Sequence, residues 1–81
     1  MERQEIFQKI VELVEPYTRN KSALKSATEQ TSILKDLEVN SARLVDIVLD
    51  MEEAFDISIA DEEADRVRTI GDGIDLILAK G

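Results

Sequence analysis

The sequence predicts a small all-α bundle with three main helices, one short helix and a long loop between the first and second helices. Three observations lead to this fold class. Apolar residues recur three and four positions apart in three segments, which is the period of an amphipathic helix. No segment alternates polar and apolar residues for long, and Ile57-Ser58-Ile59 is too short to build a sheet. A chain of 81 residues has room for a single domain, expected over residues 1–81.

The first predicted helix covers residues 3–15, and the long loop follows it. Pro16 ends this helix, because the residue before a proline avoids the α region. Residues 17–35 are largely polar and are expected to form the loop, with a short turn of helix around residues 22–28. A loop of this length in a small domain should pack against the helices or have a function of its own. The apolar positions of the first helix and its end are Ile6, Phe7, Ile10, Val11, Leu13, Val14 and Tyr17.

The strongest helix prediction covers residues 41–55. Asn40 and Ser41 both have side chains that can cap free backbone N–H groups at a helix start. Acidic residues occupy much of the remaining surface of this segment. One apolar stripe runs along it at helical spacing and consists of Leu44, Val48, Met51 and Phe55.

Two further helices are predicted in the last third of the chain. Asp61 is expected to cap a short helix over residues 62–66, with acids placed at its positive end. Thr69 and Asp72 resemble a capping box that opens a last helix over residues 70–79, with Gly81 as a stop. Ile70, Ile74, Ile77 and Leu78 are expected to face inward from this helix. The predicted core also includes Ile6, Ile10, Ile59, Ala64 and Val67.

The negative charge of the chain is concentrated in its centre. The chain has 10 Lys and Arg against 18 Asp and Glu, giving a net charge of -8. Residues 36–65 contain eleven acids and one base, Arg43, whereas the flanking segments 1–35 and 66–81 each carry +1. Such a run of acids forms either a solvated face that aids solubility or a docking surface for basic partners.

The composition excludes several classes of function. Without Cys or His, the chain cannot form a zinc finger, a disulfide framework or a Ser-His-Asp triad, and no enzyme activity is expected. The acidic charge argues against nucleic-acid binding, which needs clustered Lys and Arg. No apolar run approaches the ~20 residues that cross a membrane, and acids near the N-terminus do not fit a targeting peptide. We therefore expect a cytoplasmic protein, without membrane insertion.

The segment 37–65 resembles the acyl carrier protein family. Asn40-Ser41-Ala42 stands where the family has Asp-Ser-Leu, and Glu52-Glu53-Ala54-Phe55 matches its Glu-Glu-x-Phe helix end. The match continues with the Ile-x-Ile-like loop, the Asp-Glu-Glu-Ala run at residues 61–64, and Thr69-Ile70-Gly71-Asp72 in place of Thr-Val-Gly-Asp. The resemblance covers residues 31–79 closely and residues 3–34 by pattern and length. It implies the small acyl-carrier-like helical bundle.

The resemblance implies that Ser41 is esterified by 4'-phosphopantetheine, whose thiol carries acyl groups as thioesters. A phosphodiester there would be favoured by the positive end of the helix dipole, and the arm would supply the thiol that a Cys-free chain lacks. The alternative is that Ser41 is only a helix cap, worth about 1 kcal/mol.

The resemblance also implies partners. These are a phosphopantetheinyl transferase and acyl-transferring or synthase enzymes with basic docking patches, served by a carrier that is itself a monomer. An acyl chain would part the aliphatic core. The alternative for Val45 and Leu49 is that both simply belong to the core. The residues expected to meet partners are Asn40, Arg43, Val45, Asp46, Leu49, Glu52 and Glu53.

Four positions depart from the family pattern: Glu38 replaces Gly, Asn40 replaces Asp, Ala42 replaces Leu, and Arg43 stands where an acid is frequent. Asn caps a helix as well as Asp does, so the fold should be unaffected. Asn40, which lacks the carboxylate of Asp, and the base Arg43 both lower the negative charge beside Ser41, which indicates a specialised carrier of a fatty acid or lipid pathway with its own partners. Two alternatives remain: an unmodified interaction module, and a carrier of amino acid or polyketide intermediates.

Overall fold

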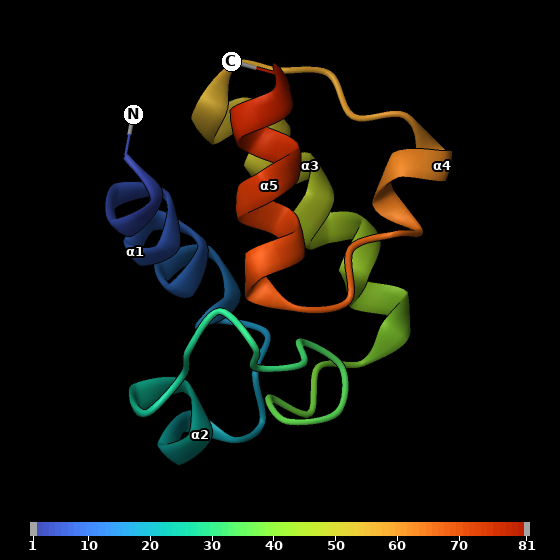
Figure 1. Cartoon of the computed structure of the whole chain (residues 1–81). Coiled ribbons are helices and arrows are strands. Elements are labelled where there is room, and N and C mark those ends of the chain that lie inside the picture. Colours follow the sequence, from blue (N-terminus) through green and yellow to red (C-terminus); the bar gives the residue numbers. More distant parts are fainter. Residues whose placement is uncertain (1, 81) are drawn as a thin grey trace.

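Three long helices pack together around an aliphatic core, which confirms the predicted all-α class. The computed structural model describes residues 2–80. In Figure 1, α5 lies between α1 and α3 in the view, and α2 with its flanking loops lies below them. Within residues 2–80 the backbone forms no strand, only an isolated bridge between Ser32 and Thr69. The elements in chain order are α1 (Arg3–Val14), α2 (Lys21–Lys25), the 3-10 helix η1 (Ser41–Arg43), α3 (Leu44–Phe55), α4 (Asp61–Ala64) and α5 (Ile70–Lys80).

The core is formed by one face of each long helix. α1 packs against both α5 and α3, so the three helices share one interior. The side chains that line it are almost all aliphatic, and among residues 2–80 Met51 is its sulfur-containing member. The buried residues of these helices include Ile6, Ile10, Val14, Ile47, Val48, Met51, Ile70, Ile74 and Ile77.

The segment between α1 and η1 packs closely onto the helices, which answers the question raised by its length. Its backbone is tied to the start of α5. The N–H of Ile33 donates to the Arg68 carbonyl (3.0 Å), and the N–H of Gly71 donates to the Glu29 carbonyl (2.8 Å). Sequence periodicity missed the apolar residues that this segment adds to the core, which are Leu24, Ile33, Leu37 and Val39.

A charged cluster fastens α1 to this segment and to α5. The guanidinium of Arg3 forms ion pairs with Glu29 and with Asp75, the latter at 2.7 Å. The hydrogen bond from Arg3 holds the pKa of Glu29 below its ordinary value. The cluster therefore joins three parts of the chain that are far apart in sequence.

Several predicted helix boundaries are corrected by the structure. The predicted helix over residues 41–55 begins with the 3-10 turn η1 and continues as α3. Asp61 is not a cap: it is the first residue of α4, and the Ala60 N–H instead donates to the Glu63 carboxylate (2.9 Å). α4 ends at Ala64, two residues before the predicted end, and the short helix expected around residues 22–28 is α2, Lys21–Lys25.

The last helix agrees with the prediction except on one face. Thr69 and Asp72 form the expected capping box, because each accepts the backbone N–H of the other at 3.1 Å. Leu78, expected inward, is 40% exposed, whereas Ile70, Ile74 and Ile77 are buried as expected. The predicted stop at Gly81 lies outside the described residues.

Candidate functional site

The chain enters α3 through a turn that is capped by Asn40. The backbone N–H of Ala42 donates to Asn40 Oδ1 at 2.9 Å, and the N–H of Arg43 donates to the Asn40 carbonyl at 2.8 Å. Asn40 itself has extended backbone angles, as an N-cap residue should. The capping function that the sequence allowed for either residue therefore belongs to Asn40.

Ser41 is left with an exposed side chain at the first position of this turn. Within residues 2–80 its hydroxyl forms no hydrogen bond, because Asn40 supplies the side-chain cap. A serine whose only role is to cap would accept a backbone N–H from the first turn. The structure thus gives the side-chain cap to Asn40 and leaves Ser41 with an exposed hydroxyl.

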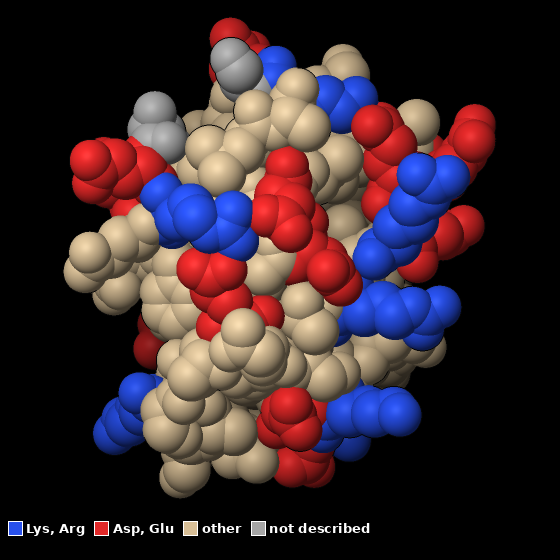
Figure 2. Space-filling model, in the orientation of Figure 1, with Lys and Arg blue, Asp and Glu red and all other residues tan. Residues whose placement is uncertain are grey.

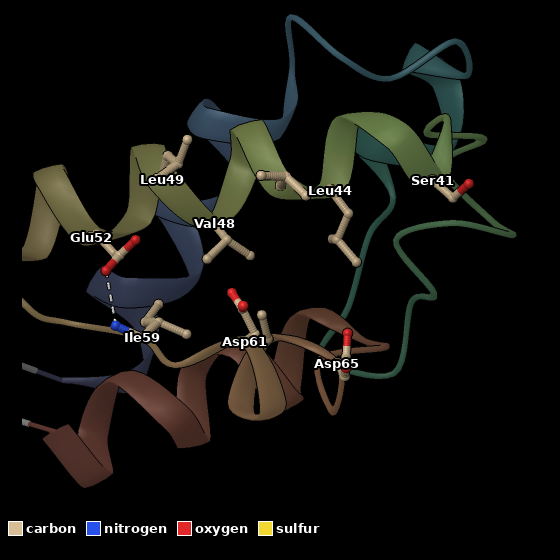
Figure 3. Close-up of a pocket in the computed structure, with 10 residues that line it drawn as sticks. Ser41, Leu44, Val48, Leu49, Glu52, Ile59, Asp61 and Asp65 are labelled. Carbon is tan, nitrogen blue, oxygen red and sulfur yellow. Dashed lines mark hydrogen bonds between the residues drawn. The ribbon is translucent and has the colours of Figure 1, made fainter.

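A groove runs from Ser41 between α3 and the segment that carries α4. Its volume is about 380 Å³, at the small end of the range for ligand pockets. Figure 3 shows Ser41 at one end, with Leu44 and Val48 pointing from α3 toward Ile59 and the acids across the groove. The full lining consists of Ser41, Leu44, Val45, Val48, Leu49, Glu52, Ile59, Asp61, Ala64 and Asp65.

The outer face of α3 presents two large apolar side chains to solvent. Val45 is 63% exposed and Leu49 is 55% exposed, whereas Ile47 and Met51 on the same helix are each 1% exposed. The sequence could not decide between core and surface for Val45 and Leu49, because α3 is apolar around more than half of its circumference. The structure places both of them on the surface, beside the groove.

The acids of α3 differ in how they are engaged. The carboxylate of Asp46 forms an ion pair with Arg43, with 3.0 Å between Nη1 of Arg43 and Oδ2 of Asp46. Arg43 is the only base of residues 36–65, and it partly neutralises the charge of Asp46. The backbone N–H of Ile59 donates to Glu52 Oε2 at 2.9 Å, whereas Glu53 is exposed. Five of the predicted docking residues therefore lie on α3, whereas Asn40 and Arg43 lie in the turn that precedes it. Two of the five, Asp46 and Glu52, have partners within the chain.

A further acid of α3 contacts the segment after α1. The Tyr17 hydroxyl donates to Asp50 Oδ2 at 2.9 Å. This hydrogen bond, together with partial burial and the nearby carboxylates, raises the pKa of Tyr17 above its ordinary value. Asp50 therefore supports the packing of α3 onto the segment after α1.

Acidic and basic side chains are interspersed over the face of the molecule that carries α5. Figure 2 shows red and blue groups side by side on this face, without a continuous acidic patch. Residues 66–80 contain the bases Arg66, Arg68 and Lys80, and Lys80 pairs with Glu63 at 2.7 Å. The acidic excess of residues 36–65 thus does not dominate this side.

Sequence reasoning placed Ile59 and Ala64 in the core but did not predict that they and two acids form the far wall of the groove. Asp61, Ala64 and Asp65 line it from α4 and the residue after it, and Ile59 lines it from the link before α4. The signals for this wall in the sequence were the motif matches at Ile57-Ser58-Ile59 and at residues 61–64. In the described part of the chain, no three potential ligand side chains cluster to hold a metal ion, and no helix has the length and apolarity of a membrane span.

Comparison with known proteins shows which proteins the chain is similar to. Residues 8–77 match the family described as a phosphopantetheine attachment site. The acyl carrier protein of Rubrobacter xylanophilus is 35% identical over 80 residues, covering 96% of this chain and 94% of that protein. The acyl carrier protein of Lactobacillus acidophilus is 35% identical over 78 residues, covering 95% and 94%. A solved acyl carrier protein from Enterococcus faecalis superposes with a TM-score of 0.81 at 28% identity, over the whole of both chains.

Proposed function

The chain belongs to the acyl carrier protein family, and on this premise we propose that Ser41 is the residue to which the prosthetic arm is attached. Proteins of this family are carriers rather than enzymes, and they hold 4'-phosphopantetheine covalently. When bound, this group supplies a terminal thiol on which acyl groups travel as thioesters. The family works with a phosphopantetheinyl transferase and with acyl-handling enzymes.

One observation carries the proposal: Ser41 is exposed, and within residues 2–80 its hydroxyl forms no hydrogen bond, since the turn is capped by Asn40. A nucleophile that a transferase must reach has to be accessible and uncommitted, and Ser41 meets both conditions. The neighbouring side chains also suit the arm. The groove that begins at Ser41 offers the apolar walls of Leu44 and Val48 to a long flexible chain.

The charge around Ser41 supports a carrier with partners of its own. Because Arg43 pairs with Asp46, the carboxylate nearest to Ser41 on α3 is not freely offered to a basic partner. Both groups are substantially exposed, so the pair is weak and a partner can compete for either member. We therefore propose that the partner enzymes of this carrier match a mixed charge pattern near Ser41, where Arg43 and Asp46 are paired. Their basic patches would face Glu53 farther along α3, and their apolar groups would contact Val45 and Leu49, which lie between the two charged regions.

The cellular role follows as the finer part of the proposal. The carrier is proposed to act as a monomer in the cytoplasm and to deliver acyl intermediates of a specialised fatty acid or lipid pathway. Trapping the loaded carrier and identifying its thioesters by mass spectrometry separates this cargo from amino acid or polyketide intermediates. Fatty acyl groups support the proposal, and aminoacyl or polyketide groups contradict its cargo.

The attachment is tested by intact-mass measurement. The purified chain is incubated with a broad-specificity phosphopantetheinyl transferase and coenzyme A, and Ser41→Ala is treated in parallel. The proposal expects a gain of one phosphopantetheinyl group in the parent chain and none in the variant. No gain in the parent, or an equal gain in the variant, contradicts it. Stable binding of partners by the unmodified chain that survives Ser41→Ala would instead favour an interaction module.

The docking part is tested by charge reversal. Glu53→Lys should weaken association with the transferase several-fold and flatten its salt dependence, because it removes an exposed acid from the partner face. Glu12→Lys, which reverses an exposed acid on α1, is the matched control and should leave association nearly unchanged. Equal effects of the two reversals would mean that only the net charge matters.

A further inference from the structure

The chain turns at Glu38, three residues before Ser41, in a backbone conformation that glutamate rarely adopts. The φ angle of Glu38 is 51°, which lies in the left-handed region. Within residues 2–80 the only other non-glycine residue with a positive φ is Asp56, which ends α3. The Cβ of a residue in this region crowds the backbone, so glycine, and to a lesser degree asparagine and aspartate, are the residues that tolerate it. Glu38 therefore carries backbone strain that a glycine at this position would relieve.

Contacts on both sides of Glu38 hold it in this conformation. The side chains of Leu37 and Val39 are buried in the core, with 0% and 4% exposure. The Leu37 carbonyl accepts a hydrogen bond from the Thr18 hydroxyl. The N–H of Val39 donates to the Ile33 carbonyl at 3.4 Å. Because both neighbours are anchored, the backbone of Glu38 cannot relax to a common conformation without moving one of them out of the core.

The side chain of Glu38 forms no polar interaction that offsets this strain. It is exposed, and within residues 2–80 its carboxylate has no hydrogen bond and no ion pair. The other two acids within five residues of Ser41 both have partners. Asp36 accepts a backbone N–H at 2.7 Å, and Asp46 pairs with Arg43 at 3.0 Å. In the described part of the chain, Glu38 is thus the acid near Ser41 whose carboxylate is not engaged.

We propose that Glu38 is a recognition residue, which presents its carboxylate to a basic group of the phosphopantetheinyl transferase that modifies Ser41. This inference rests on the proposed attachment at Ser41. Three residues of chain span at most about 11 Å, and a partner of ordinary size covers about 800 Å² of the surface that it binds. A transferase that reaches the Ser41 hydroxyl therefore also covers Glu38. The interface extends from α3 onto the segment before η1.

The charge and the strain of Glu38 both favour this role. A carboxylate without a partner in its own chain is available to Arg or Lys, and the attraction speeds the encounter of the two proteins at low salt. A residue that is strained, and is kept so by its surroundings, is typical of functional positions. Glycine at this position would relieve the strain but would remove the carboxylate. Stability and recognition are therefore opposed at Glu38, and substitutions can separate them.

The test compares three variants with the parent chain. Glu38→Gln removes the charge and keeps the strain, whereas Glu38→Gly removes both. Glu12→Gln removes an exposed acid from the middle of α1, changes the net charge equally, and is the matched control. The initial rate of modification by the transferase with coenzyme A is followed by intact mass, at carrier concentrations below KM and at several salt concentrations. The melting temperature of each unmodified chain is measured separately.

At low salt, Glu38→Gln should lower the rate of modification about two- to fivefold and flatten its salt dependence, whereas Glu12→Gln should leave both nearly unchanged. Glu38→Gly should lower the rate at least as much, although its melting temperature should be roughly 2–8 °C above that of Glu38→Gln. Equal rates for Glu38→Gln and Glu12→Gln overturn the inference, as does a Glu38→Gly chain no more stable than Glu38→Gln. Failure to modify the parent chain refutes the proposed attachment and the inference with it. Modification of Ser41 that Glu38→Gln does not slow refutes only the role of Glu38.

Discussion

The division of roles between Asn40 and Ser41 leads to a sharp prediction about stability. Asn40→Ala removes the oxygen that accepts the Ala42 N–H at 2.9 Å, and loss of a helix cap costs about 1 kcal/mol. For a domain of this size, that corresponds to a melting temperature lower by about 4–8 °C. Ser41→Ala removes a hydroxyl without a hydrogen bond from an exposed position, so it should change the free energy of unfolding by less than about 0.5 kcal/mol.

Urea denaturation of the unmodified chain at neutral pH measures both effects under one set of conditions. Asn40→Asp is the control, because it retains an acceptor of the same reach and should lose only a few tenths of a kcal/mol at most. The opposite pattern, a cost of about 1 kcal/mol for Ser41→Ala with none for Asn40→Ala, would show that Ser41 caps the helix. In that case the central reason for assigning a reactive role to Ser41 would be lost.

Two further predictions concern the packing and the charge of α5. Gly71→Ala should destabilise the fold by about 1–3 kcal/mol in urea denaturation, because a Cβ there would lie 2.9 Å from the Glu29 carbonyl oxygen. The Cβ of Gly73→Ala would meet the Ile10 side chain at 3.4 Å, so this substitution should destabilise the fold distinctly less. The reverse order would contradict the close approach of the loop to α5. The hydrogen bond from Lys80 lowers the pKa of Glu63 below its ordinary value of 4.5, so its stabilisation should be present above that pH and disappear as the pH falls through the lowered pKa. The stability difference between the parent and Lys80→Met should therefore shrink in acid, and a difference that is independent of pH would refute this linkage.

The long helices were predictable because their patterns are periodic. The stripe through Leu44, Val48 and Met51 and the capping box of Thr69 and Asp72 each depend on residues within three or four positions of one another. Such local rules also place Ser41 at the start of a helix. They cannot assign the cap between two adjacent residues that are both able to cap, and the structure was needed to give that role to Asn40.

The features that could not be predicted from the sequence depend on contacts between segments that are distant in the chain. Ile33 and Leu37 lie in a stretch without helical period, so nothing in the sequence shows that both are buried beneath the bundle. The exposure of Leu49 could not be predicted either, because it depends on which side of an apolar helix α1 covers. The bond between Glu52 and Ile59 spans seven residues across a turn, and no sequence rule anticipates it.

The structure shows that the acids of residues 36–65 differ in whether they have partners within the chain. The eleven acids of residues 36–65 do not act as one uniform surface, since some have partners within the chain. Asp46 is paired with Arg43, Asp50 accepts from Tyr17, and Glu52 accepts from the Ile59 backbone. Electrostatic attraction of partners should therefore depend most on the exposed acids that have no such engagement.

The attachment of the arm to Ser41 is tested most directly by mapping the modified peptide. Trypsin cleaves after Lys35 and Arg43, and the peptide 36–43 between these sites contains Ser41 as its only hydroxyl residue. After incubation with a phosphopantetheinyl transferase and coenzyme A, we predict that this peptide alone gains the mass of one phosphopantetheinyl group. A gain on any other peptide, or no gain on residues 36–43 while a known carrier is modified in the same reaction, would contradict it.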